Sequence, residues 1–145
     1  MAMGLDVSKE FSLVGLVVAA AVVANLYMMF GVVGARKKYG VHYPTLYALE
    51  TDNKEAKIFN CVQRGHQNYL EIVPFFFAAL LVAGLQHPRI ATAAGILFVV
   101  ARIIYFNDYS TGVPKKRERG AALGYMCVMV LIVCCISFTV HQLFF

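Results

Sequence analysis

The stretch FSLVGLVVAAAVVANLYMMFGVV, residues 11–33, decides the fold class of this chain. Its single interior polar side chain is that of Asn25. A helix needs about 20 apolar residues to cross the hydrocarbon layer of a bilayer, and this stretch is long enough. It is too long for the apolar region of a signal peptide, and the residues before it are not a basic lead-in. We therefore predict a first membrane span that stays in the protein.

The composition extends this interpretation to the whole chain. Of the 145 residues, 60% are hydrophobic and 14% are charged, whereas a soluble domain carries about 25% charged residues. We predict an all-α integral membrane protein, a four-helix bundle forming one domain over residues 1–145. The predicted spans are residues 11–33, 58–86, 89–106 and 120–145.

Basic residues near the span ends predict the orientation. They gather in loop one with the entry to the second span, and in loop three. The members are Arg36, Lys37, Lys38, Lys54, Lys57 and Arg64, then Lys115, Lys116, Arg117 and Arg119. Loops one and three should face the cytosol, with both termini on the opposite, lumenal side. Topology therefore accounts for the net charge of +5, and no nucleic-acid partner is expected.

The four cysteines point to no special chemistry. Cys61, Cys127, Cys134 and Cys135 lie in or beside apolar segments without metal-ligand or disulfide spacing. We interpret them as small buried apolar residues and expect no metal site. Acylation of the adjacent pair Cys134 and Cys135 stays an open alternative.

Polar side chains form two stripes within the apolar segments. Arg64, Asn68 and Glu71 follow the spacing i, i+4, i+7, which places them on one helix face. A charge at bilayer depth costs about 2.5–3.5 kcal/mol and usually marks a site, a partner or a pathway. The stripe could bind a ligand that offers a carboxylate to Arg64 and an ammonium to Glu71. Alternatively, each charge could pair with a neighbouring helix.

Arg102, Tyr105 and Tyr109 form the second stripe, with spacing i, i+3, i+7. Taken singly, the tyrosines could belong to an interfacial aromatic belt, and Arg102 could reach back to the headgroups. Their common face favours a joint site at the cytosolic end of the third span. On charge alone, the basic run of residues 115–119 is a solvated cytosolic loop.

The second predicted span carries FNCVQRGHQNYLE at residues 59–71, followed by Pro74. This run resembles the second-helix motif of the MAPEG family, membrane-associated proteins in eicosanoid and glutathione metabolism. The likeness is greatest to its type-three microsomal glutathione S-transferases, which share RxHQNxxE, ARKKY at residues 35–39 and YPTLYA at residues 43–48. The leukotriene-C synthases of the family differ, with Tyr in place of Ile72 and FERVY in place of residues 59–63.

The resemblance implies a homotrimer that binds glutathione between adjacent subunits near the cytosolic face. Arg64, Asn68 and Glu71 would hold the carboxylate, backbone and amino group of glutathione. The other implied contacts are Arg36 of a neighbouring subunit, His66 where relatives use a polar side chain, Arg102, and the pocket walls Tyr105 and Tyr109. His66 and Gln67 flank the first stripe, and one of them is a candidate to face a partner subunit.

The same resemblance implies the catalytic residue. Arg117 best matches the arginine that lies opposite the glutathione thiol in the leukotriene-C synthases, with Arg119 as the alternative. An arginine within about 4–6 Å would lower the thiol pKa and favour the nucleophilic thiolate.

The predicted function is that of a glutathione-dependent enzyme of the endoplasmic reticulum membrane. It would conjugate lipophilic electrophiles or reduce lipid hydroperoxides, with glutathione as co-substrate and no prosthetic group. One rival is a non-catalytic scaffold that presents lipid to a partner enzyme, and another is a purely structural membrane subunit. Saturable glutathione binding separates the enzyme from both rivals.

Overall fold

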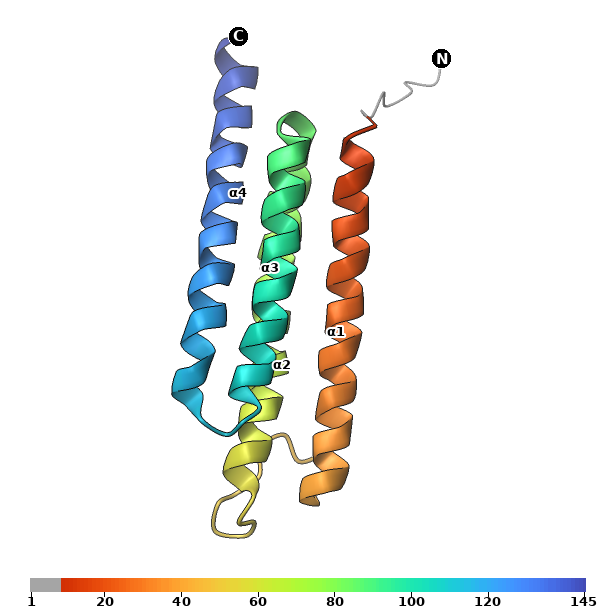
Figure 1. The fold of residues 1–145 in the computed structure, drawn as a ribbon, viewed down its shortest axis with the longest axis vertical. Helices are drawn as coiled ribbons and strands as arrows, with labels where there is room; N and C mark the ends of the chain where they lie inside the picture. Colours follow the sequence, from red (N-terminus) through yellow and green to blue (C-terminus); the bar gives the residue numbers. More distant parts are fainter. Residues whose placement is uncertain (1–8) are drawn as a thin grey trace.

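The computed structural model describes residues 9–145, which form four long α-helices, one short 3-10 helix and no strand. The elements are α1 (Phe11–Tyr39), α2 (Ala56–Gln86), α3 (Pro88–Tyr109), η1 (Pro114–Arg117) and α4 (Glu118–Phe144). The four long helices run side by side along one axis (Figure 1). Each is long and apolar enough to cross a membrane. The predicted all-α membrane bundle of four helices is therefore confirmed.

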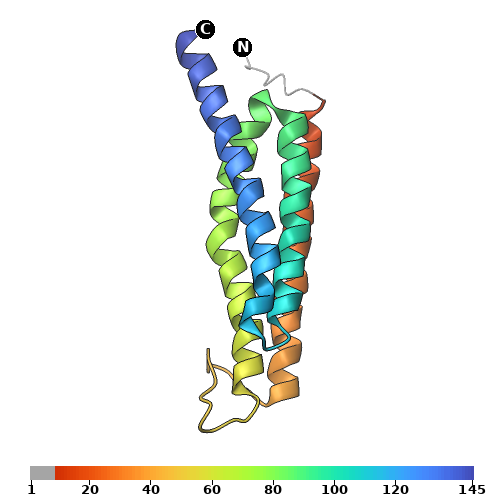
Figure 2. The same ribbon diagram turned by 60° about the vertical axis from the view of Figure 1, so that its left-hand side comes forward.

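The connections divide the bundle into two ends. The α1–α2 loop and the segment before α4 lie at one end, while the α2–α3 junction and the end of α4 lie at the other (Figures 1 and 2). The basic residues of both predicted cytosolic loops therefore share one end of the molecule. We call this end the basic end.

Helix α1 continues beyond residue 33 through three basic residues of its last turn. Cations suit this position because the carboxyl end of a helix carries partial negative charge. The helix stops at Gly40, whose φ of 65° is left-handed and is adopted at little cost only by glycine. The N–H groups of Gly40 and Val41 both donate to the carbonyl of Arg36, which closes the helix end.

A single residue, His87, separates α2 from α3. Pro88 begins α3, where a missing N–H removes no helical hydrogen bond. Pro74 lies inside α2, and the helix continues through it. The second and third spans therefore form a tight antiparallel pair, which aligns residues near the start of α2 with the end of α3.

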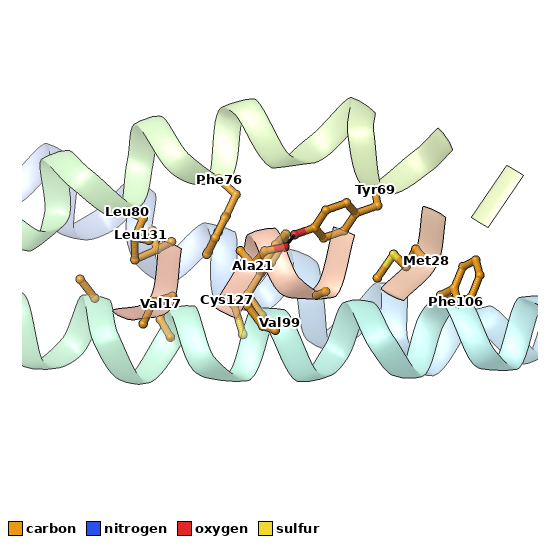
Figure 3. Packing of buried hydrophobic residues seen from close by; sticks show 14 of the residues in the cluster. Val17, Ala21, Met28, Tyr69, Phe76, Leu80, Val99, Phe106, Cys127 and Leu131 are labelled. Atoms are coloured by element: carbon orange, nitrogen blue, oxygen red, sulfur yellow. Dashed lines mark hydrogen bonds between the residues drawn. The ribbon is translucent and has the colours of Figure 1, made fainter. Parts of the chain in front are cut away.

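Aromatic and small residues fill the core between the helices (Figure 3). The rings of Phe76 and Phe98 stack with centroids 3.9 Å apart and join α2 to α3. The buried hydroxyl of Tyr69 donates to the carbonyl of Ala21 at 2.6 Å and joins α2 to α1. Large apolar side chains also cover the outside of the bundle, as expected of a surface that faces lipid tails.

Gly120 and Gly124 line the contact between α4 and α3 near the basic end, and Gly120 makes the close approach possible. A Cβ atom on Gly120 would lie 2.5 Å from the backbone nitrogen of Tyr105 and 2.7 Å from the carbonyl oxygen of Ala101. One turn later, a Cβ on Gly124 would lie 3.5 Å from Cδ of Arg102. Small residues allow such close backbone approach in membrane bundles. This contact fixes η1, which directly precedes α4, beside the end of α3.

Candidate functional site

The first predicted stripe forms a hydrogen-bonded unit on α2. Nη1 of Arg64 lies 2.5 Å from Oε1 of Glu71, and Nδ2 of Asn68 donates to Oε2 of Glu71 at 3.3 Å. The two charged residues pair with each other along one helix, and not with neighbouring helices as the alternative proposed. Their side chains are 37% and 47% exposed, so the pair is accessible from outside the bundle.

Arg102 of α3 joins this unit from inside the bundle. Its Nη2 donates to Oδ1 of Asn68 at 2.6 Å, and its guanidinium lies 4.2 Å from the centroid of the Tyr105 ring. Arg102 is 1% exposed, so it does not reach the headgroups as the alternative suggested. Its Nε is buried without a hydrogen-bond partner, and neither ion pair within residues 9–145 includes it.

The two tyrosines continue the contacts toward the basic end. The rings of Tyr105 and Tyr109 meet edge to face with centroids 5.8 Å apart, and the guanidinium of Arg117 lies 4.6 Å from the centroid of the Tyr109 ring. Both tyrosines are buried beside Cys61, whereas belt tyrosines would face the bilayer interface. Arg119 is exposed at the start of α4 and makes no comparable contact among the described residues.

One continuous path therefore connects the two predicted stripes and the basic loop. In order, its members are Arg64, Glu71, Asn68, Arg102, Tyr105, Tyr109 and Arg117. Three cations accompany a single carboxylate along it. Such a set is suited to an anionic or zwitterionic ligand and can stabilise a negative charge at its Arg117 end.

Two predicted site residues lie elsewhere in the bundle. Arg36 is buried, its Nη1 donates to the carbonyl of Thr45 at 2.8 Å, and its guanidinium lies 4.3 Å from the centroid of the Tyr43 ring. His66 shares a hydrogen bond of 3.0 Å with Oδ1 of Asn25 on α1. This contact gives the interior amide of the first span its polar partner.

The α1–α2 loop adds contacts that the motif spacing did not single out. The hydroxyl of Tyr47 hydrogen-bonds Oε1 of Gln67 on α2. The side-chain amide of Asn60 donates to the carbonyl of Ala48 and accepts from its N–H, both at 2.9 Å. The sequence signals were the family resemblance of residues 43–48, the place of Gln67 beside the first stripe, and the seven-residue spacing that puts Asn60 and Gln67 on one helix face.

Among the described residues, no three or more His, Cys, Asp or Glu side chains come together in a way that could hold a metal ion. Cys61, Cys127, Cys134 and Cys135 are all free.

Known proteins are similar to this chain over most of its length. Residues 14–137 match the MAPEG family. The chain is 35% identical over 119 residues to the uncharacterized protein sll1147 of Synechocystis sp., covering 81% of each chain. It is 33% identical over 109 residues to human microsomal glutathione S-transferase 2, covering 73% of this chain and 69% of that protein. It is 30% identical over 108 residues to bovine leukotriene C4 synthase, covering 74% and 67%.

The family match includes α2 and α3 entirely, most of α1 and α4, and the whole polar path. The family predicted from the second-helix motif is thereby confirmed, and with it an integral membrane protein. This chain belongs to the MAPEG family.

Proposed function

We propose that this chain is a glutathione-dependent membrane enzyme that activates the glutathione thiol against lipophilic substrates. Two relatives carry names of this kind, a glutathione S-transferase and a leukotriene C4 synthase. The observation that carries the proposal is the continuous polar path from the Arg64–Glu71 pair to Arg117. It matches the chemistry of glutathione, a tripeptide with two carboxylates, an ammonium group and a thiol.

The accessible pair would bind the charged ends of glutathione. A carboxylate of glutathione can bind the guanidinium of Arg64 through two hydrogen bonds. The ammonium of glutathione then pairs with Glu71 in place of Arg64. The ligand thus exchanges one ion pair for two, and Asn68 remains hydrogen-bonded between them. Arg102 favours the binding of an anionic ligand, because its buried cation has no carboxylate partner among the described residues. Tyr105 and Tyr109 wall the site.

Arg117 would activate the thiol. A free thiol has a pKa of about 8.5, so only a few per cent is thiolate at neutral pH. A guanidinium within about 4–6 Å lowers such a pKa by roughly 1–3 units and makes the thiolate the major form. The thiolate then attacks an electrophilic carbon, and the C–S bond forms as a leaving group departs or as the adduct takes up a proton. On a lipid hydroperoxide it would instead attack oxygen and break the O–O bond, which gives the lipid alcohol and a glutathione sulfenic acid; a second glutathione converts that acid to the disulfide and water. Arg117 suits this role better than Arg119, because Tyr109 holds it against the path.

We further propose that the active form is a homotrimer with glutathione between subunits. The Arg64–Glu71 pair is exposed on one subunit, and leaving charges against lipid is costly. A neighbouring copy would cover the pair, supply Arg36 and place His66 beside the ligand. The basic end faces the cytosol of the endoplasmic reticulum, and the opposite end is lumenal. The lipophilic substrate enters from the bilayer. The proposed reactions are the transferase and peroxidase reactions of the type-three microsomal glutathione S-transferases.

The experiment is the ultraviolet absorbance of glutathione thiolate on purified, detergent-solubilised protein at pH 7. A saturable thiolate band that grows with glutathione concentration is expected. If glutathione neither binds nor ionises, the polar path is structural and a lipid-presenting scaffold becomes the better proposal. The scaffold needs no thiolate, so this measurement separates the two functions.

A further inference from the structure

The α1–α2 loop covers one flank of the Arg64–Glu71 pair. At 3.6 residues per turn, Gln67 and Asn68 project about 50° to either side of the line through Arg64 and Glu71. Asn68 receives a hydrogen bond from Arg102 of α3. Gln67, on the other flank, receives one from Tyr47 of the loop. Arg102 therefore lies beside one flank of the accessible ion pair, and Tyr47 lies beside the other.

The loop that carries Tyr47 is firmly anchored. The paired hydrogen bonds of Asn60 hold the backbone of Ala48, the residue after Tyr47, on α2. Nδ2 of Asn53 donates to the carbonyl of Tyr39 at 2.8 Å, which ties the loop to the end of α1. The loop lies beside the first turns of α2 (Figure 2). Tyr47 is thus held in place, and its side chain is still 39% exposed.

We propose that Tyr47, oriented by Gln67, is a further glutathione-binding residue; the inference rests on the proposed function. Its hydroxyl hydrogen is directed to Oε1 of Gln67, so the hydroxyl oxygen keeps its acceptor sites for a ligand. A tripeptide spanning Arg64 and Glu71 presents peptide N–H groups to both flanks of the ion pair, and one of them donates to this oxygen. Gln67 is a positioning residue because it acts through Tyr47.

The test compares Tyr47→Phe, which removes only the hydroxyl, with Tyr43→Phe in the same loop. Tyr43 is 71% exposed and its hydroxyl makes no hydrogen bond among the described residues, so it is a matched control. Tyr47→Phe should raise the Kd for glutathione about 3- to 10-fold, the range of one lost hydrogen bond. Turnover at saturating glutathione should stay within about two-fold of the unchanged protein, because the thiol end is not affected. Tyr43→Phe should change neither quantity.

Gln67→Met supplies a second variant, which removes the acceptor at similar volume. Gln67→Met should raise the Kd for glutathione to a similar extent. The variant that combines it with Tyr47→Phe should have the same Kd as Tyr47→Phe alone. If the fold-increases in Kd of the two single variants multiply in the double variant, Gln67 does not act through Tyr47. An unchanged Kd in Tyr47→Phe, while Glu71→Gln still weakens binding, would overturn this inference and leave the proposed function standing. If the unchanged protein binds no glutathione, both fail together.

Discussion

At the scale of single residues, Arg102 shows how this bundle holds a charge inside a membrane. Only 1% of it is exposed, and its partners are the neutral oxygen of Asn68 and the face of the Tyr105 ring. Hydrogen bonds and a cation–π contact partly replace the lost water. No carboxylate among the described residues neutralises it. An anion that binds beside Arg102 would supply the negative charge that the described residues do not.

Arg117→Ala tests the activation step at residue scale. Binding of glutathione should persist, while turnover at pH 7 should fall about 10- to 30-fold, because the thiol returns to its ordinary pKa near 8.5. The deficit should shrink as the pH rises toward 9, where the thiol ionises without help. Rate against pH at saturating glutathione measures both effects. Arg119→Ala is the control and should behave like the unchanged protein; the reverse pattern would assign the role to Arg119.

Glu71→Gln tests the binding step. The change keeps the shape and hydrogen-bonding oxygen of the side chain but removes the charge that the ammonium of glutathione would meet. The Kd for glutathione should rise about 10- to 100-fold, the range for a hydrogen bond to a charged group. Isothermal titration measures it, with Glu50→Gln in the exposed loop as a control. Equal affinity in Glu71→Gln would remove this carboxylate from the site.

At the scale of elements, the contact between α3 and α4 places Arg117. Helix α4 can lie against α3 because Gly120 has no side chain, and η1 directly precedes that point. The tyrosines of α3 then meet the arginine of η1 across the junction. The position of Arg117, the proposed activating residue, therefore depends on Gly120.

Gly120→Ala tests this dependence. The added Cβ would lie 2.5–2.7 Å from backbone atoms of α3, which cannot move aside as a side chain can. Overpacking of this kind costs about 1–3 kcal/mol, so the thermal unfolding midpoint in detergent should fall. Thiolate formation should weaken as well, because η1 shifts with α4. Gly15→Ala in α1 is the matched control, since no atom lies within 4 Å of its Cβ position. An unchanged midpoint in Gly120→Ala would mean that the two helices separate freely.

At the scale of the whole molecule, one subunit leaves the proposed site unfinished. Its ion pair is exposed, and its Arg36 is turned into its own loop. The exposed pair fits a site that is completed at the boundary between copies. To take part in that site, Arg36 of the next copy would have to leave its own contact with Thr45.

Mixed oligomers of Arg36→Gln and Glu71→Gln subunits test this arrangement. Each variant alone should bind glutathione weakly. When both are expressed together, some boundaries combine the intact Glu71 of one copy with the intact Arg36 of the next, and part of the binding should return. Glutathione titration of the purified mixture measures the recovery. No recovery, with oligomers shown to be mixed, would place both residues of a site in one subunit.

Periodicity predicted much of this protein, because apolar length and helix spacing are local properties. The run of residues 11–33 and its counterparts indicated four membrane helices, and the spacing of Arg64, Asn68 and Glu71 placed them on one face. Local spacing also put Arg102, Tyr105 and Tyr109 on one stripe. These conclusions needed no knowledge of how the helices pack.

Only the tertiary structure decided which polar groups meet. It paired Arg64 with Glu71, joined Asn68 to Arg102 from another helix, and brought Arg117 to Tyr109. It also turned His66 toward α1 and placed Tyr47 on the flank of α2. The sequence fixes the face on which a side chain lies, but its partner depends on the rotation and depth of the neighbouring helix. Those are set by close contacts such as that of Gly120, between residues far apart in the chain.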